Sequence, residues 1–397
     1  MSRQIIRNGQ ILTPEGIISN GALVIEEGII SRIVEGEPEI KGGEYEVIDA
    51  CGHYVSPGFI DLHTHGGGGS DFMDGTVDAF LKAAEAHARY GTTYMLPTTL
   101  TSTNEELFKT FAVFREATTQ NRRGATLGGI HLEGPYFAYN QRGAQDPRYL
   151  RDPDPSEYME ILDKGGDIIK RWSLAPELSG ALEFADVLTE RGIMVSMAHT
   201  DALFEEVMEA YDHGFRHITH FYSATSTITR RNAFRYAGVI EAGYLNDGIV
   251  LEIIADGIHV PSPLLKLVYK LKGSGSINLV TDSMRAAGMP EGVYRLGSLT
   301  DGQEVLVEDG VAKLFDRTAF AGSVCTTNRC VRTFHQQGGV SIHEAVRMMT
   351  ETPARLLGLS STKGSLRVGH DADIVIFDDD VNIEKVFIGG KCIVCNE

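Results

Sequence analysis

His63 and His65 stand two residues apart at the end of an apolar run, and four glycines, Gly66 to Gly69, follow them directly. In a β-strand, residues i and i+2 point to the same face, so the two imidazoles would project together from the end of a strand. Two neutral imidazoles beside a glycine-rich turn are typical ligands of a divalent transition metal. The alternative is a pair of strand histidines whose ring nitrogens make ordinary hydrogen bonds. Residues further along the chain favour the metal.

Further candidate ligands stand where other predicted strands end. They are Glu133 in Gly-Ile-His-Leu-Glu, His199 in Met-Ala-His, His220 in His-Ile-Thr-His and Asp282 in Val-Thr-Asp. Imidazole nitrogens and carboxylate oxygens are donors that zinc, iron and manganese all accept. In a barrel of parallel strands, the active site lies at the C-terminal ends of the strands. We therefore expect these four residues to meet His63 and His65 in one metal site.

The other histidines are expected to play lesser parts. His131 shares a strand face with Glu133, so we expect it to support the site without binding metal. His217 is three residues from His220, so on a strand it would face the other way, behind the site or toward a helix. The remaining histidines lie outside the predicted strand ends and are expected at the surface or in packing; they are His53, His87, His213, His335, His343 and His370.

The elements that would carry these residues alternate between strand and helix. Candidate strands fall at 55–65, 92–98, 126–134, 171–177, 192–199, 217–222, 249–256 and 277–282. Amphipathic stretches such as 76–90 and 201–213 separate most of them. Eight strands that alternate with helices predict an α/β fold, a (β/α)8 TIM-like barrel. A β-like insertion at 290–320 and helices near 324–338 and 341–357 are expected after the eighth strand.

The two ends of the chain share a different pattern, that of short strands and turns. Candidate strands fall at 10–13, 22–25, 29–33 and 45–48, and again at 364–369, 372–377 and 384–388. The N-terminal set stops before it can close a core. We therefore predict a small β-sandwich domain built from both termini, residues 1–54 plus 361–397, beside a metal-dependent barrel at 55–360.

Composition excludes several classes of partner. The formal net charge of −18 over 397 residues, without a Lys/Arg-rich cluster, argues against nucleic acid. No apolar run is long enough to span a membrane and the N-terminus has no apolar signal core, so no membrane partner is expected. Five scattered cysteines indicate a reducing compartment, and the protein is expected to be cytoplasmic. A small anionic substrate remains compatible with this composition, because positive charge inside a pocket outweighs the net negative charge of the whole chain.

The motifs at these positions resemble those of the amidohydrolase superfamily, and within it the N-acetylglucosamine-6-phosphate deacetylases. The resemblance spans most of the chain, in the family's order. The segments that carry it are PGFIDLHTH (57–65), HLEGP (131–135), AHT (198–200), THFY (219–222), ADGIH (255–259), VTD (280–282) and AGS (321–323). HLEGP together with ADGIH is specific to this branch, whereas HxH is shared by many amidohydrolases.

The resemblance implies a role for each matching residue. Glu133, His199 and His220 would bind the metal common to the family, and His63 and His65 a second metal that Glu133 bridges. The cofactor would be one or two divalent metals per subunit, with zinc the first candidate and iron or manganese the alternatives. Asp282 matches the catalytic aspartate, and we also count it among the metal ligands. His259 matches the histidine that polarises the amide carbonyl. Arg231 matches the arginine that contacts phosphate. Substrate-contact positions are Ala144, Gln145, Ser223, Ala224, Phe320, Ala321 and Gly322. A homodimer is implied as well.

The implied reaction fits the chemistry of these residue types. A bound metal lowers the pKa of its water to roughly 7, and a neighbouring carboxylate can take that proton and deliver it to the departing amine. The expected reaction is the release of acetate from an N-acetylhexosamine 6-phosphate, most simply N-acetyl-D-glucosamine 6-phosphate, in amino-sugar catabolism. Arg231 would neutralise the phosphate. The alternative for Arg231, beside Arg230, is a solvated loop charge.

Three positions depart from the family's pattern. The family usually has Asn, Met and His where this chain has Ser223, Thr225 and Gln145. These departures bear on the sugar more than on the reaction, so N-acetylgalactosamine 6-phosphate is an alternative substrate. Hydrolysis of a cyclic amide is another alternative, disfavoured because the segment 172–177 lacks the lysine that some amidohydrolases carry at the fourth strand. A sugar-phosphate-binding regulator is the non-enzyme alternative, and the complete ligand set with Asp282 argues against it.

Overall fold

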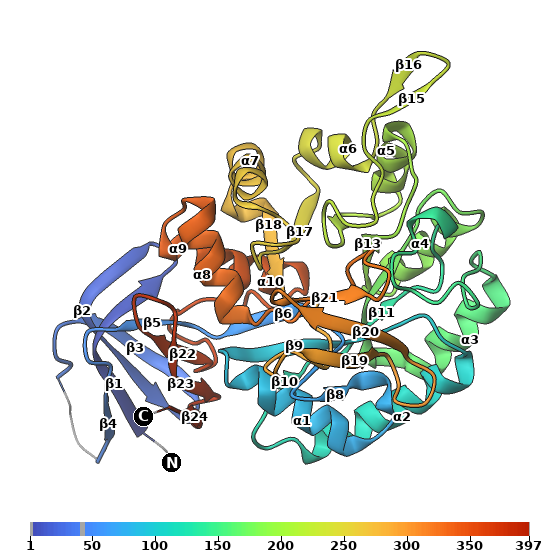
Figure 1. Cartoon of the computed structure of the whole chain (residues 1–397). Coiled ribbons are helices and arrows are strands. Elements are labelled where there is room, and N and C mark those ends of the chain that lie inside the picture. Colours follow the sequence, from blue (N-terminus) through green and yellow to red (C-terminus); the bar gives the residue numbers. More distant parts are fainter. Residues whose placement is uncertain (1–2, 40–43, 397) are drawn as a thin grey trace.

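Figure 1 shows a computed structural model of the chain, which describes residues 3–39 and 44–396. A twisted sheet formed by both ends of the chain lies beside a barrel formed by its centre, and both termini lie at the sheet (Figure 1). The predicted fold class, a TIM-like barrel with a small β domain, is confirmed. Within the described ranges, no helix is both long enough and apolar enough to cross a membrane.

Eight parallel strands form the barrel. In spatial order they are β6 (Phe59–Thr64), β9 (Thr92–Thr99), β11 (Ile130–Glu133), β12 (Ile169–Leu174), β13 (Met194–Met197), β14 (His217–Ile218), β17 (Val250–Ile254) and β18 (Ile277–Val280), and the short β10 (Thr126–Leu127) also pairs with β9. The first and last strands are joined just past the end of β18. There Asp282 N donates to His63 O and His65 N donates to Ser283 O, both at 2.8 Å. These bonds place the ends of β6 and β18 side by side.

Helices follow most of the barrel strands and cover the outside (Figure 1). They are α1 (Val77–Ala88), α2 (Asn104–Gln120), α3 (Pro155–Gly165), α4 (Ala181–Glu190), α5 (Phe204–Asp212), α6 (Val239–Leu245), α7 (Ser262–Lys272), α8 (Thr327–Gly338), α9 (Ile342–Met349) and α10 (Glu351–Leu356). Local sequence fixes their starts. At α2, Thr103 Oγ1 accepts a hydrogen bond from Glu106 N, and the Glu106 carboxylate accepts one from Thr103 N, which is a capping box.

Single-turn 3₁₀ helices occur at η1 (Phe72–Asp74), η2 (Tyr139–Gln141), η3 (Gly166–Ile168) and η4 (Ser274–Ser276).

Strand β12 shows how alternation divides the two sides of the barrel wall. Trp172 faces the helices, where its ring stacks on Tyr136 and meets Phe184 of α4 edge-on at 4.8 Å. Its neighbour Arg171 faces the barrel interior and is fully buried. The interior layer below the strand ends is therefore polar, and Arg171 meets Glu252 of β17 there.

The terminal sheet has the order β24–β23–β22–β5–β1–β2–β3, with β4 also on β1. Its strands are β1 (Arg3–Thr13), β2 (Gly16–Glu26), β3 (Ile29–Glu35), β4 (Glu46–Asp49), β5 (Tyr54–Pro57), β22 (Ile374–Phe377), β23 (Ile383–Ile388) and β24 (Lys391–Cys395). The antiparallel pair of β22 with β5 joins the two ends of the chain. The domain boundaries at 54/55 and 360/361 stay a prediction.

Four predicted strands differ from those observed, and one of them, at 126–134, divides into β10 and β11. The strand at 55–65 divides at Gly58, because β5 pairs with β1 and β22 in the terminal sheet and β6 pairs with β9 in the barrel. The segment 364–369 forms turns, since Gly364 and Gly369 both have positive φ. The strand at 217–222 ends after two residues, at Ile218.

Smaller sheets complete the molecule. The insertion after β18 is a three-stranded antiparallel sheet of β19 (Gly292–Leu296), β20 (Gln303–Glu308) and β21 (Val311–Leu314), and β7 (Gly66–Gly67) pairs with β8 (Ser70–Asp71). A hairpin of β15 (Thr229–Arg231) and β16 (Phe234–Tyr236) projects away from the barrel (Figure 1). All residues of both hairpin strands are exposed.

Candidate active site

The six predicted ligand residues meet at the C-terminal ends of five barrel strands. His63 and His65 lie at the end of β6, Glu133 ends β11, and the other three stand two residues past β13, β14 and β18. All six are buried. The last three, His199, His220 and Asp282, have φ values of 47°, 30° and 45°. This left-handed region is costly for residues with a Cβ and is found where function demands a particular side-chain direction.

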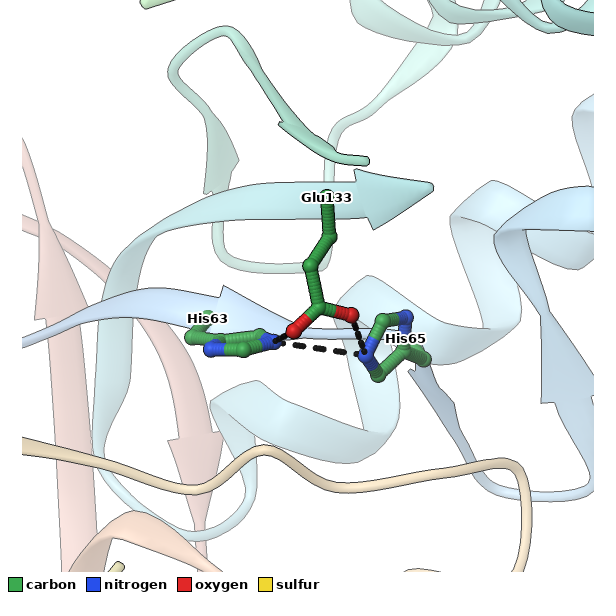
Figure 2. A group of neighbouring side chains, drawn as sticks. All are labelled: His63, His65 and Glu133. Atoms are coloured by element: carbon green, nitrogen blue, oxygen red, sulfur yellow. Dashed lines mark hydrogen bonds and ion pairs between the residues drawn. The ribbon is translucent and has the colours of Figure 1, made fainter. Parts of the chain in front are cut away.

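Glu133 is the centre of the cluster. Figure 2 shows its carboxylate between His63 and His65, whose Nε2 atoms each lie 3.3 Å from one of its oxygens. On the other side, Glu133 Oε1 lies 3.3 Å from His220 Nε2 and 3.5 Å from His199 Nε2. Two groups that could hold a metal therefore share Glu133 as a common member.

The hydrogen bonds behind three of the imidazoles fix their tautomer. Nδ1 of His199 faces the Gln141 carbonyl at 2.7 Å, and Nδ1 of His220 faces the Ser223 carbonyl at 3.1 Å. Nδ1 of His63 faces the Glu252 carboxylate at 2.8 Å. Because these oxygens only accept, each Nδ1 carries the proton and each neutral ring directs its Nε2 lone pair at the cluster.

Lone pairs and carboxylate oxygens so close together repel one another unless a cation lies between them. His199 Nε2 and His220 Nε2 are 3.2 Å apart, and His63 Nε2 and His65 Nε2 are 3.3 Å apart. Without a metal, a proton must take that place. Burial lowers the pKa of His63, but the charges of Asp282 and Glu133 raise it well above its usual value. The donor set therefore fits a divalent transition metal.

Several neighbours hold these ligands in place. Gln145 Oε1 accepts from Thr101 N at 3.0 Å, which directs Gln145 Nε2 to donate to Glu133 Oε2 at 2.7 Å. His131 packs edge-on against the His63 ring and hydrogen-bonds Ser173, as its supporting role predicted. His87 of α1 is buried rather than superficial, with its Nε2 2.9 Å from Gly66 O.

Two charged residues below the site were not predicted. Glu252 of β17 and Arg171 of β12 form a fully buried ion pair at 2.5 Å, and Glu252 accepts from His63 Nδ1. Charged residues inside otherwise apolar strand segments were the available signal. His217 faces the barrel interior, bonded to Ser196 Oγ, with its Nε2 3.8 Å from Glu252. It thus lies behind the site, and the alternative that it faces a helix is wrong.

A cavity of about 320 Å³ opens above the ligands. Seven residues predicted to contact substrate line it, namely Ala144, Gln145, Ser223, Ala224, His259, Phe320 and Gly322. The lining residues that were not predicted are Leu100, Gly143, Tyr222, Ile254, Leu296 and Ala319. Ala321 is buried beside the lining, and His63 is buried beneath it. The cavity wall therefore combines apolar and polar residues, and the floor is formed by the polar ligand residues.

His259 is held at the cavity wall by Asp256. The Asp256 carboxylate accepts from His259 Nδ1 at 2.7 Å and from the backbone N–H of Ile258 and His259 at 2.8 Å each. Burial raises the pKa of Asp256, but these hydrogen bonds and the His259 charge lower it below its usual value. The ring of Phe320 packs against His259 at 4.5 Å.

Arg231 is the predicted residue that lies apart from the others. It sits on the exposed β15–β16 hairpin, where its guanidinium lies over the Tyr236 ring, and it does not line the cavity described above. Arg230 precedes it on the same strand. In this arrangement, Arg231 is therefore not placed to contact a substrate in the cavity of its own chain.

Comparisons with known proteins agree with this geometry. Residues 54–393 match the model of the amidohydrolase family. An N-acetylglucosamine-6-phosphate deacetylase of Bacillus subtilis is 37% identical over 82% of this chain and 81% of its own length. An N-acetylgalactosamine-6-phosphate deacetylase of Escherichia coli O157:H7 is 32% identical over 98% of each chain. The crystal structure of N-acetylglucosamine-6-phosphate deacetylase from Pasteurella multocida superposes with a TM-score of 0.91 at 30% identity, covering 99% of this chain and 100% of that one.

The charge on His65 predicts how the metal-free protein responds to pH. Burial lowers the pKa of His65, but hydrogen bonds with Asp282 and Glu133 raise it to about 9. A histidine whose pKa is raised on folding stabilises the protein fully below its unfolded value and loses that contribution as pH rises through the folded value. In chelator we expect the melting temperature to fall between pH 6.5 and 9, from a loss on the order of 3 kcal/mol.

A scan of melting temperature against pH tests this, with the metal-loaded protein as control. Metal displaces the proton and binds more tightly as pH rises, so the loaded protein should not show the fall. His65→Gln should make the fall smaller in chelator, and the part that remains comes from His63, whose pKa is also raised. Equal stability of the metal-free wild type at pH 6.5 and pH 9 would contradict the assigned cluster.

Proposed function

Since the chain belongs to the amidohydrolase family, we propose that it hydrolyses the acetamide of an N-acetylhexosamine 6-phosphate and releases acetate. The simplest substrate is N-acetyl-D-glucosamine 6-phosphate, which yields D-glucosamine 6-phosphate in amino-sugar catabolism. The observation that carries this function is the carboxylate of Glu133, set between two pairs of imidazoles at the floor of a sugar-sized cavity. Relatives that carry out this reaction cover most of the chain.

The proposed cofactor is a pair of divalent metals per subunit. His63 and His65 with Glu133 would hold one, and His199 and His220 with Glu133 the other. Zinc is our first choice, with iron and manganese as alternatives, because mixed imidazole and carboxylate ligation accepts all three. A cation held there supplies the Lewis acidity that makes water a nucleophile near neutral pH.

Asp282 is the proposed proton carrier. Its Oδ1 lies 3.3 Å from Nε2 of both His63 and His65, at the edge of the metal cluster and on the cavity wall. Burial raises the pKa of Asp282, but the charges of those histidines lower it below its usual value, so the carboxyl is ionised at neutral pH. It can accept the proton of the attacking water and return it to the amine nitrogen when the C–N bond breaks.

His259 is the proposed donor to the amide carbonyl. Its Nδ1–H is donated to Asp256, so only Nε2 is free to face the substrate. Nε2 can donate a hydrogen bond only when the ring carries a proton on both nitrogens. Asp256 thus acts as a positioning residue that orients the ring. A hydrogen bond aimed at the developing oxyanion contributes more in the transition state than in the ground state.

A second candidate substrate is N-acetylgalactosamine 6-phosphate. The observation that favours it is the pair Gln145 and Ser223, which line the cavity where the deacetylase family usually has His and Asn. A relative that deacetylates the galacto sugar covers 98% of this chain. Ala144, Ala224, Phe320, Ala321 and Gly322 are proposed to contact the sugar with either epimer.

Recognition of the phosphate is proposed to involve a second copy of the chain. Arg231 lies on a hairpin that extends away from its own barrel, so it can meet a phosphate only in a neighbouring cavity or after the hairpin moves. The hairpin also exposes Phe234 and Ile228, at 72% and 59% of their surface, and burial of such side chains favours association. We therefore propose a homodimer in which this hairpin of each subunit approaches the other.

The cytoplasm is the proposed location, with the sugar phosphate as the partner of the site. The five cysteines are free thiols, which is compatible with a reducing compartment. The net charge of −18 disfavours nucleic acid as a partner.

Acetate release by the purified, metal-loaded protein tests the proposed reaction. We expect turnover of N-acetylglucosamine 6-phosphate well above that of unphosphorylated N-acetylglucosamine, with N-acetylgalactosamine 6-phosphate measured alongside. Preference for the galacto epimer would keep the reaction and assign specificity to Gln145 and Ser223. If none of the three sugars released acetate, the proposed function would be wrong.

Asp282→Asn tests the proton carrier. The amide keeps the shape of the side chain but cannot accept the proton, so we expect kcat to fall by roughly 10²-fold or more. Metal content, measured by elemental analysis, should stay as in the wild type. Retained turnover at full metal content would exclude Asp282 from proton transfer.

Arg231→Ala tests phosphate recognition, and Arg230→Ala is the matched control on the same strand. Loss of the guanidinium should raise KM for the phosphorylated sugar at least tenfold and leave KM for the free sugar nearly unchanged. Arg230→Ala should change neither value. If Arg231→Ala changed KM for the phosphorylated sugar and for the free sugar equally, Arg231 would be excluded from the phosphate site.

A further inference from the structure

Glu252 of β17 connects the two proposed metal positions from below. Its Oε1 accepts from His63 Nδ1 at 2.8 Å and from the backbone N–H of His220 at 3.0 Å. His63 belongs to one position and His220 to the other. One carboxylate oxygen therefore touches a ligand residue of each.

The carboxylate of Glu252 is itself held firmly. Its Oε2 pairs with Arg171 Nη1 at 2.5 Å, and both side chains are fully buried. Arg171 is anchored in turn by three hydrogen bonds, to Leu62 O, Thr219 Oγ1 and Ser196 Oγ, at 3.2, 2.8 and 3.0 Å. Glu252 is therefore a carboxylate acceptor in a fixed orientation.

We propose that Glu252 is the positioning residue that makes His63 a metal ligand, and so determines whether the His63–His65 position holds metal. This inference rests on the proposed metal-dependent function. By accepting from Nδ1, Glu252 keeps the lone pair of His63 on Nε2, where it faces Glu133 and His65. By accepting from His220 N, it also holds the backbone of that residue at φ 30°.

Glutamine cannot replace Glu252 in this role, although it has the same size. If the amide nitrogen faced His63, Nδ1 would have to accept and Nε2 would carry the proton, so His63 could not bind metal. If the amide nitrogen faced Arg171, two donors would oppose each other in a fully buried site. The first orientation prevents His63 from binding metal, and the second removes the ion pair that holds the acceptor against His63, so both weaken the His63–His65 position. The Nδ1 atoms of His199 and His220 keep their own carbonyl partners.

Metal stoichiometry of full-length Glu252→Gln, dialysed against increasing chelator, tests the inference. Wild type should retain two equivalents per chain, and Glu252→Gln should lose one of them at roughly 10- to 100-fold lower chelator concentration. Ser196→Ala is the matched control, because it removes a hydrogen bond to Arg171 and leaves both Glu252 contacts intact. It should lose metal as the wild type does.

A second variant covers the chance that Glu252→Gln fails to fold with Arg171 unpaired. The double variant Arg171→Met with Glu252→Leu leaves no unpaired buried charge and no acceptor for His63 Nδ1, and it should fold and still lose one equivalent. Two equivalents with wild-type resistance to chelator, in either variant, would overturn the inference. Wild type that releases acetate with a single bound metal would overturn it too while keeping the proposed function, and wild type without metal or turnover would overturn both.

Discussion

The structure depends on one electrostatic constraint, the convergence of four imidazole Nε2 atoms on the carboxylate of Glu133. Their distances to its oxygens are 3.3 to 3.5 Å, and all five side chains are buried. Neutral lone pairs beside an anion need a cation among them, so the cluster gains most of its stability when metal binds. The left-handed backbone of His199, His220 and Asp282 is tolerated because the barrel strands fix the residues before them.

This constraint also explains why the barrel interior is polar beneath the site. In barrels of this type the interior is usually filled by branched apolar side chains. Here Arg171, Glu252 and His217 occupy the layer below the ligands, without exposed surface. A buried ion pair contributes little net stability by itself, because desolvation offsets its attraction. The contact with His63 accounts for the ion pair at this place. Glu252 orients a metal ligand, and that role offsets the stability lost by burying two charges.

Sequence reasoning recovered the elements whose signals are local and failed where the partner is distant. The barrel strands follow from apolar runs, and five of these runs end in a proposed ligand residue. Strand β14 is only two residues long because the chain turns at His220 into its left-handed conformation, which no local pattern announces. Arg171 and Glu252 are 81 residues apart, so neither segment alone reveals the pair. The projection of Arg231 away from the barrel depends on a hairpin whose direction is set by tertiary packing.

Gln145 shows how a substrate-contact position can change without loss of the metal chemistry. Its carbonyl is occupied by Thr101 N, and one of its two amide hydrogens is donated to Glu133 Oε2. Only the second amide hydrogen remains for the cavity that Gln145 lines. The residue therefore presents a single neutral donor, suited to a sugar hydroxyl. Ser223 also has two roles. Its backbone carbonyl orients His220, and the residue lines the cavity. Substitution at either position changes which sugar oxygen is contacted, and the reacting groups stay where Glu133 and Asp282 hold them.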